Sequence, residues 1–198
     1  GKDNKKFVVQ MFGIDTTGKT AAIFVTGFDP FFYVKVGDDW TDSNMMEFVN
    51  HIKSKMGPYY EESLVKPKLI KRHKLYGFDN NKLHTFIRLK FKNMPAFNKA
   101  KNLWFKDTMP DGIFQRNLIP DGIVFNDINI EIYESNIPPL LRLFHIQEIS
   151  PSGWIALQSD RFTQHKKLTT TCDFEFSVKY NDIVGLPKRE TAVPYKIL

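Results

Sequence analysis

The stretch GIDTTGKT, residues 13–20, fits the pattern G-x-x-x-x-G-K-[ST] of a phosphate-binding loop. Such a loop needs a strand before it and a helix after it, because the helix N-terminus completes the phosphate site. Residues 7–12 suit the strand, but residues 21–27 are a short run of strand formers. We therefore expect a β-hairpin, in which residues 16–19 form the turn and Gly18 supplies the positive φ.

A hairpin at this place leaves no helix to bind a phosphate. The following residues are therefore interpreted as a false match to a cofactor-binding loop: Gly13, Gly18, Lys19 and Thr20. The alternative, a P-loop NTPase, predicts nucleotide binding that is lost with Lys19→Ala, and we expect no such binding.

Metal and nucleophile chemistry has little support in the spacing of residues. The five histidines form none of the pairs H-x-H, H-E-x-x-H or H-x₃-H. The single cysteine, Cys172, excludes a disulfide framework and a thiolate zinc site. Asp127 and Glu131 are expected on one strand face, where an exposed surface is a commoner explanation than a metal site. A Ser-His-Asp arrangement has no local support, although one assembled in space stays open. We predict no catalytic residue and no metal site.

Positive charge is concentrated in the middle of the chain. Residues 64–106 hold 12 Lys and Arg against one acid, Asp79, whereas the rest of the chain holds 16 against 21. A block this basic on an otherwise acidic chain indicates a polyanion partner. The alternative is a solvated surface that keeps the protein in solution.

The strongest functional signal lies in the strand expected at residues 84–92, where Ile87, Leu89 and Phe91 share one face. The other face carries an aromatic ring among basic side chains, as single-stranded nucleic-acid platforms do. There the cations follow the phosphates and the ring stacks on a base. The candidate nucleic-acid-binding residues on this strand and its neighbour are Lys71, Arg72, Lys74, Phe86, Arg88, Lys90 and Lys92.

The elements that would position these residues follow a mixed pattern of strands and helices. Strands are expected at residues 7–12, 20–25, 31–36, 65–73, 84–92, 128–133, 152–157 and 169–180. Helices are expected from a cap at Asp42 or Ser43 to Met56, from a cap at Asn93 to Trp104, and from Asn136 to Gln147. The fold class is α+β, with mixed or antiparallel sheets, a few short helices, and OB-like and RRM-like (or ferredoxin-like) subdomains.

Four stretches, in order, resemble the N-terminal region of family B DNA polymerases, the delta-like enzymes and their relatives in large DNA viruses. They are GFDPFFYVKV from Gly27, YGFDNNKLHTFIRLKFKNMPAFNKAKNLW from Tyr76, YESNIPPLLRLFHIQEISPSGWI from Tyr133, and CDFEFSVKYNDIVGLP from Cys172 with AVPYKIL. Together they cover nearly the whole chain. The last stretch is similar to the lead-in to the family's exonuclease domain.

The resemblance implies a parent enzyme that copies DNA with two Mg²⁺ ions and usually proofreads from 3′ to 5′. In the family, the D-x-E metal ligands of the exonuclease come after the strand that resembles YKIL, and the polymerase aspartates come later still. None of these catalytic residues falls on this sequence, so we expect no cofactor and no activity in residues 1–198 themselves.

The sequence therefore predicts a non-catalytic N-terminal domain of a DNA-directed DNA polymerase over residues 1–198, with sublobes at 1–60, 61–132 and 133–198. Its expected roles are contact with the single-stranded DNA template and bracing of the exonuclease and palm domains. No membrane partner is expected, and the expected location is the cytoplasm or nucleus of a virus-infected cell. The alternative is a free-standing single-stranded DNA- or RNA-binding module.

Overall fold

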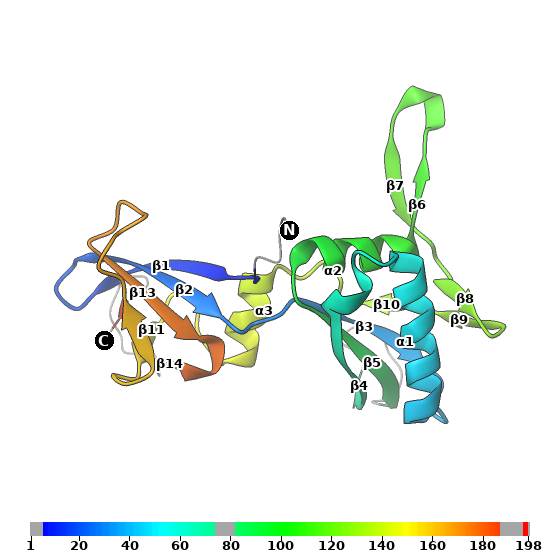
Figure 1. Cartoon of the computed structure of the whole chain (residues 1–198), viewed down its shortest axis with the longest axis horizontal. Helices are drawn as coiled ribbons and strands as arrows, with labels where there is room; N and C mark the ends of the chain where they lie inside the picture. Colours follow the sequence, from blue (N-terminus) through cyan, green and yellow to red (C-terminus); the bar gives the residue numbers. More distant parts are fainter. Residues whose placement is uncertain (1–5, 74–81, 187–195, 198) are drawn as a thin grey trace. The chain divides into compact units, whose positions relative to one another are not determined.

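The computed structural model describes residues 6–73, 82–186 and 196–197 of the chain. The chain divides into two compact units (Figure 1). Residues 29–136 form one, here called the central unit, and residues 1–28 together with 137–198 form the other, the terminal unit. This division differs from the three consecutive sublobes expected from the sequence, because strands from the two ends of the chain pair with each other.

The central unit contains most of the helix and the basic block of the sequence. Its elements are β3 (Phe31–Val36), α1 (Asp42–Met56), η1 (Glu61–Ser63), β4 (Leu64–His73), β5 (Leu83–Phe91), α2 (Met94–Lys101), η2 (Asn102–Trp104), β6 (Phe105–Thr108), η3 (Pro110–Gly112), β7 (Gln115–Leu118), β8 (Ile123–Phe125), β9 (Ile128–Ile130) and β10 (Ile132–Tyr133).

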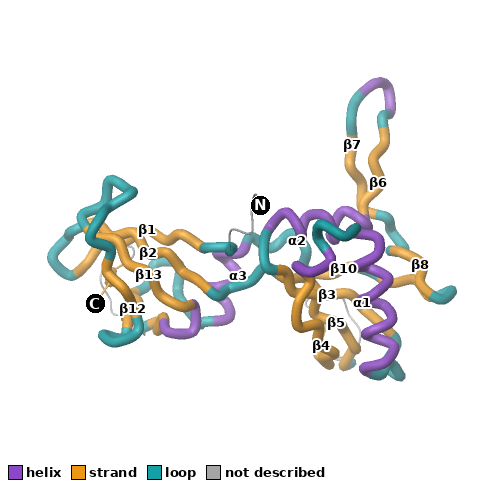
Figure 2. The backbone as a smooth tube through the Cα atoms, viewed as in Figure 1, coloured by secondary structure: helices purple, strands orange, loops and turns teal. Residues whose placement is uncertain are grey.

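Four of these strands form an antiparallel sheet in the order β10-β3-β5-β4. With α1 between β3 and β4 and α2 between β5 and β10, the chain follows the β-α-β-β-α-β path of the ferredoxin-like fold. RNA-recognition motifs also present a four-stranded sheet of this kind. The expectation of an RRM-like subdomain is therefore confirmed, and the path of the tube in Figure 2 shows both helices on one side of the sheet.

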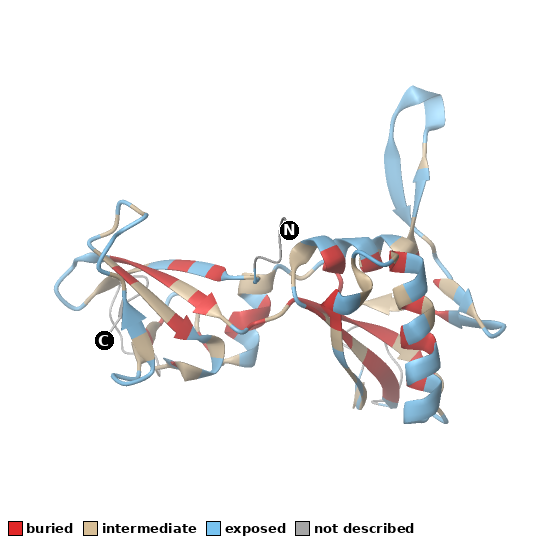
Figure 3. Cartoon of the chain, in the orientation of Figure 1, coloured by how far each residue is buried: buried red, intermediate tan, exposed pale blue. Residues whose placement is uncertain are grey.

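The core of the central unit lies between that sheet and the two helices (Figure 3). Phe32, Ile87 and Leu89 from the sheet and Phe48 from α1 have no exposed side-chain surface. Trp104, which we expected as the last residue of the second helix, lies in the 3-10 turn after α2. It is fully buried, and its Nε1 donates to the backbone oxygen of Ile130 at 2.8 Å.

Both helix starts are capped by side chains. Asn93 caps α2 as expected, because its Oδ1 accepts from the backbone N–H of Ala96 at 2.9 Å. The cap of α1 is Thr41 rather than Asp42 or Ser43, since Thr41 and Asn44 exchange side-chain and backbone hydrogen bonds in a capping box. Asp42 instead lies in the first turn of α1.

Two small hairpins follow α2. Strands β6 and β7 pair antiparallel around the first Pro-Asp-Gly turn, and β8 pairs with β9 after the second. Pro-Asp-Gly is a typical turn sequence. The β6–β7 hairpin projects from its unit, and its second strand is exposed along its whole length (Figures 1 and 3).

The terminal unit is mostly strand. Its elements are β1 (Val9–Asp15), β2 (Thr20–Thr26), α3 (Pro139–Ile146), β11 (Trp154–Leu157), β12 (Phe162–Gln164), β13 (Phe174–Lys179), η4 (Tyr180–Asp182), β14 (Ile183–Gly185) and β15 (Lys196–Ile197). Seven strands form one mixed sheet in the order β12-β13-β2-β1-β15-β11-β14. The strand expected at residues 169–180 is shorter than predicted, since its first residues form a loop. An OB-like subdomain stays a prediction.

Candidate nucleic-acid interface

The stretch that matches a phosphate-binding loop is a β-hairpin turn. Strands β1 and β2 pair antiparallel, with Val9 opposite Val25 at one end and Ile14 opposite Thr20 at the other. Gly18 in the turn between them has a φ of +86°. A strand follows the turn in place of the helix that a phosphate site needs. The hairpin expectation is confirmed.

The N–H groups of this turn already have an internal acceptor, the carboxylate of Asp15. Its Oδ1 accepts from the backbone N–H of Thr17 at 2.8 Å and of Lys19 at 2.9 Å, and from the Thr17 hydroxyl at 2.7 Å. The hydroxyl hydrogen bond from Thr17 is the largest of the effects that lower the pKa of Asp15. Thr20 is bonded to Asp173 on the loop before β13. The N–H donors that a phosphate would require are thus already hydrogen-bonded to the carboxylate of Asp15 in the turn itself.

The seven candidate nucleic-acid-binding residues do not form one surface. We call the side of the four-stranded sheet opposite α1 and α2 its second face. Arg72, Phe86, Arg88 and Lys90 lie on this face, as their register and the alternation of strand side chains require. The remaining three do not join them: Lys71 lies on the helix side of β4, Lys92 follows the end of β5, and Lys74 is outside the described residues.

The ring of Phe86 is not available for stacking on a base. Its exposed fraction is 2%, although we expected an open platform. Tyr133 of β10 packs edge-on against it at 5.3 Å between ring centroids, and Tyr33 of β3 at 6.3 Å. The Arg72 guanidinium lies 5.7 Å from the ring centroid. The expectation of an exposed ring is wrong because residues distant in sequence cover it.

Arg72 is held in place by an acid that follows β10. Its guanidinium forms an ion pair through two hydrogen bonds with Glu134, whose side chain is 8% exposed, and lies 4.4 Å from the ring of Tyr33. Burial lowers the pKa of Arg72, but the hydrogen bond and charge of Glu134 outweigh it, so the pKa is raised. Arg72 therefore belongs to the cover over Phe86 more than to a binding surface.

A group of basic side chains lies where β4 and β5 meet. We call Lys66, Lys68, Arg88 and Lys90 the cationic corner. Lys68 lies directly opposite Arg88 in the register of β4 and β5, and Lys66 lies in a bulge of β4 with a φ of +47°. Burial, and next the charge of Arg88, lower the pKa of Lys90. Sequence reasoning missed Lys66 and Lys68, because the bulge that places them is not visible in the residue pattern.

A polar pocket of about 330 Å³ lies at the other end of β3 and β5. It is lined by Lys35, Lys82 and His84 together with Asp38 and Glu131. The mixture of bases and acids does not make a site for a polyanion. We therefore place the candidate interface at the cationic corner.

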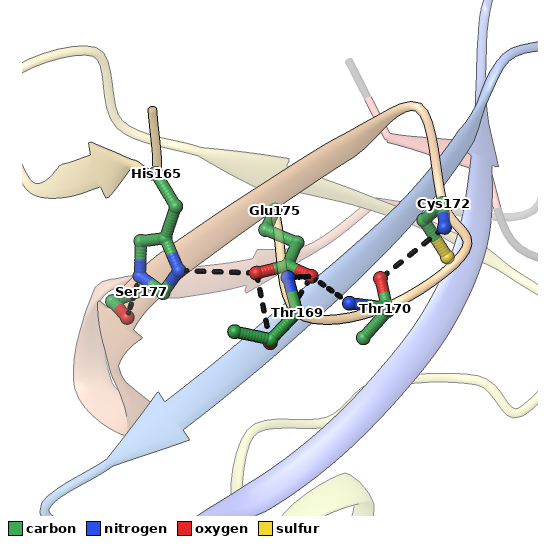
Figure 4. Close-up of polar contacts among 6 residues, drawn as sticks. All are labelled: His165, Thr169, Thr170, Cys172, Glu175 and Ser177. Carbon is green, nitrogen blue, oxygen red and sulfur yellow. Dashed lines mark hydrogen bonds and ion pairs between the residues drawn. The ribbon is translucent and has the colours of Figure 1, made fainter. Parts of the chain in front are cut away.

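The terminal unit holds a buried carboxylate that sequence reasoning missed. Glu175 of β13 has no exposed side-chain surface, and its oxygens accept from the backbone N–H groups of Thr169 and Thr170 (Figure 4). Burial raises the pKa of Glu175, but these hydrogen bonds and one from His165 outweigh it and lower the pKa to about 2. The carboxylate thereby holds the loop before β13 against the sheet.

Glu175 is also part of a row with the connectivity of a Ser-His-acid triad. His165 Nδ1 lies 3.3 Å from Glu175 Oε2, and His165 Nε2 lies 2.6 Å from the Ser177 hydroxyl (Figure 4). The His165 ring stacks on Phe24 at 5.5 Å. Ser177 lies in the middle of a regular strand and lines neither the polar pocket nor the apolar pocket beside Phe162 and Phe174. A triad needs space for a substrate carbonyl at the hydroxyl. Neither of these two pockets provides that space, and we assign this row a structural role.

The two acids that we expected on one strand face, Asp127 and Glu131, do not lie together. Asp127 is in the turn between β8 and β9 with a φ of +61°, and Glu131 accepts a hydrogen bond from the Tyr133 hydroxyl at 2.7 Å. In the described part of the chain, no group of three His, Cys, Asp or Glu side chains could hold a metal ion. No helix among the same residues is long and apolar enough to cross a membrane.

Comparison with known proteins places the chain among DNA polymerases. The family model "DNA polymerase family B, exonuclease domain" matches residues 130–198, starting upstream of the lead-in expected from the sequence. A DNA polymerase of Phaeocystis pouchetii virus is 54% identical over 99% of this chain and 19% of its own length. A DNA polymerase of Acanthamoeba polyphaga mimivirus is 28% identical over 100% of this chain and 11% of its own length.

A cellular relative and a solved structure agree with these viral matches. The DNA polymerase delta catalytic subunit of Schizosaccharomyces pombe is 24% identical over 90% of this chain and 16% of its own length. The structure of the family B DNA polymerase from the archaeon Pyrobaculum calidifontis matches 98% of this chain and 20% of that chain, with a TM-score of 0.59 and 14% identity. The chain spans about a fifth or less of the length of these proteins. It belongs to family B of the DNA polymerases, as an N-terminal region of the kind found in large DNA viruses.

Proposed function

We propose that this chain is the non-catalytic N-terminal part of a DNA-directed DNA polymerase, and that it contacts the single-stranded template. The observation that carries the proposal is the concentration of cations on one side of the four-stranded sheet, opposite the helices. Phosphates dominate the affinity of proteins for nucleic acids. The central unit has the ferredoxin-like path that RNA-recognition motifs share, which further supports it.

A second part of the proposed role is to brace the exonuclease and palm domains of the parent polymerase in an infected host cell. The similarity of the whole chain to polymerases several times its length supports this assignment. The Mg²⁺ ions of the parent enzyme would be bound by residues outside this chain, because the metal-ligand motifs that the family resemblance implies do not fall on this sequence. The free-standing binding module gains no support from the comparisons.

Binding of a labelled single-stranded oligonucleotide, dT20, followed by fluorescence anisotropy across a salt titration, tests the template contact. We expect weak binding that falls as salt rises, because phosphate contacts release counterions. Joint replacement of Arg88, Lys90 and Lys92 by Ala should weaken it. If the chain shows no binding even at low ionic strength, template contact is rejected and bracing alone is left.

A further inference from the structure

The cationic corner contains more positive charge than its surroundings compensate. Lys68 and Arg88 are directly opposite each other across β4 and β5, a placement in which like charges destabilise a sheet. Lys90 is on the same face as Arg88, two residues along β5, and Lys66 acts on its charge from the bulge. Among the described residues, the charge of Asp29 acts on Lys90 in the opposite sense. Such a concentration of positive charge would be relieved by a bound anion.

Arg88 also has a donor without an acceptor. Its Nε is buried, and no hydrogen-bond partner reaches it among the described residues. Buried polar groups in native proteins are almost always paired, and an unpaired donor on a charged group costs free energy. The guanidinium lies 5.8 Å from the ring centroid of Phe31 on the neighbouring strand β3. An anionic oxygen is the acceptor that a guanidinium donor binds best.

The backbone of β4 contributes to this arrangement. The register shifts between Val65 and Lys68, and Lys66 takes a left-handed conformation there that non-glycine residues seldom adopt. Bulges of this kind redirect side chains and are frequent beside functional sites. Lys66 and Lys68 are both exposed, whereas Arg88 and Lys90 are half-buried. The corner thus combines two half-buried cations with two exposed ones.

We propose that the cationic corner binds a phosphate of a single-stranded nucleic acid, with the Arg88 guanidinium as a donor, and that no base stacks on Phe86. The inference rests on the proposed template contact and specifies its chemistry. The protein then binds the sugar–phosphate backbone of the nucleic acid, independently of its base sequence. This differs from the usual RRM-like mode, in which aromatic rings on the sheet stack two or three bases.

The test compares dT20 with a strand of equal length made of abasic tetrahydrofuran units, using the full 198-residue chain. If phosphates alone are bound, the two dissociation constants should agree within about threefold, because base stacking adds ~1–3 kcal/mol per base where it occurs. Much weaker binding of the abasic strand would overturn the inference while leaving the template contact intact.

Three variants test which residues make the contact. Lys68→Gln and Arg88→Gln should each weaken dT20 binding and lower the slope of log K against log salt by about 0.7, as expected for one lost phosphate contact. Lys71→Gln is the matched control, since Lys71 is exposed on the same strand but lies on its other face. Arg88→Lys keeps the charge and removes Nε, and serves if Arg88→Gln does not fold.

The outcomes separate the two proposals. Absence of binding by the unmodified chain at low salt rejects both of them. Binding that Lys68→Gln and the Arg88 variants leave unchanged, or that Lys71→Gln weakens as much, rejects the cationic corner alone.

Discussion

At the scale of single residues, the charge states of Glu175 and Arg72 depend on their hydrogen bonds more than on their exposure to solvent. Glu175 is buried without becoming neutral, because two backbone N–H groups and His165 bind its carboxylate. Arg72 stays charged beside aromatic rings because Glu134 pairs with it. In both cases the ionised group fastens a segment to a sheet, which is a structural task.

Glu175 should make stability depend on pH at the acidic end. Its pKa is lowered to about 2 from 4.5, so the stabilisation is complete above pH 4.5 and is lost as the pH falls towards 2. Glu175→Gln should lower the urea midpoint at pH 6, and the difference from the unmodified chain should shrink at pH 3. Glu148→Gln, at an exposed position of the same unit, is the control and should change neither value. A difference that stays constant with pH would contradict the assignment.

At the scale of elements, turns and caps follow their residue chemistry closely. The β1–β2 hairpin is an example, because Gly18 has the positive φ and Asp15 binds the N–H groups of the turn. No atom lies within 4 Å of a Cβ added at Gly18, so only the backbone conformation resists substitution.

Gly18→Ala should therefore destabilise the chain by about 1–2 kcal/mol, the cost of a left-handed conformation for an L-residue. Gly18→Asn should cost less, since Asn tolerates this region. Urea denaturation measures both changes.

Isothermal titration with ATP and Mg²⁺ should show no binding by the unmodified chain. Heat of binding that disappears with Lys19→Ala would instead establish a nucleotide site.

The β6–β7 hairpin should contribute little to stability. Its exposed tip includes Ile113 and Phe114, at 63% and 60% exposure, and neither belongs to the core. Replacing both by Ser should change the free energy of unfolding by no more than about 0.5 kcal/mol. Ile130→Ala, at a fully buried position of the same unit, should cost about 2–5 kcal/mol in the same denaturation experiment. Comparable losses from both variants would mean that the tip packs against the unit.

The sequence predicts elements better than it predicts their partners. Local features can be predicted because each depends on residues that are neighbours in the sequence. Examples are the basic strand, the Asn93 cap and the two Pro-Asp-Gly turns. The covering of Phe86 by Tyr133 was not predictable, because β10 joins the sheet from a distant part of the chain. The position of Lys68 depends on a bulge that the residue pattern does not reveal.

At the scale of the whole molecule, the two units differ in how they are built. Every residue of the main hydrophobic core, from Phe32 to Ile130, comes from the continuous central unit. The terminal unit needs both ends of the chain, because β2 pairs in parallel with β13.

The central unit should therefore fold when produced alone as residues 29–136. We expect cooperative urea unfolding and a dispersed NMR spectrum from this fragment, because its core is complete. Residues 1–28 alone should be unstructured, since a single hairpin is at best marginally stable in water. A molten fragment 29–136, without cooperative unfolding, would show that the central unit depends on the terminal one.

The pairing of β2 with β13 also means that one edge of β2 has no partner strand while the chain is being synthesised. Thr20 bonds to Asp173, which the ribosome adds 153 residues later. At roughly 5–20 residues per second, the edge of β2 waits on the order of ten seconds or more for its neighbour. An unpaired strand edge is a site for association with other chains. During translation the β1–β2 hairpin thus keeps one edge open to association with other chains until β13 has been made.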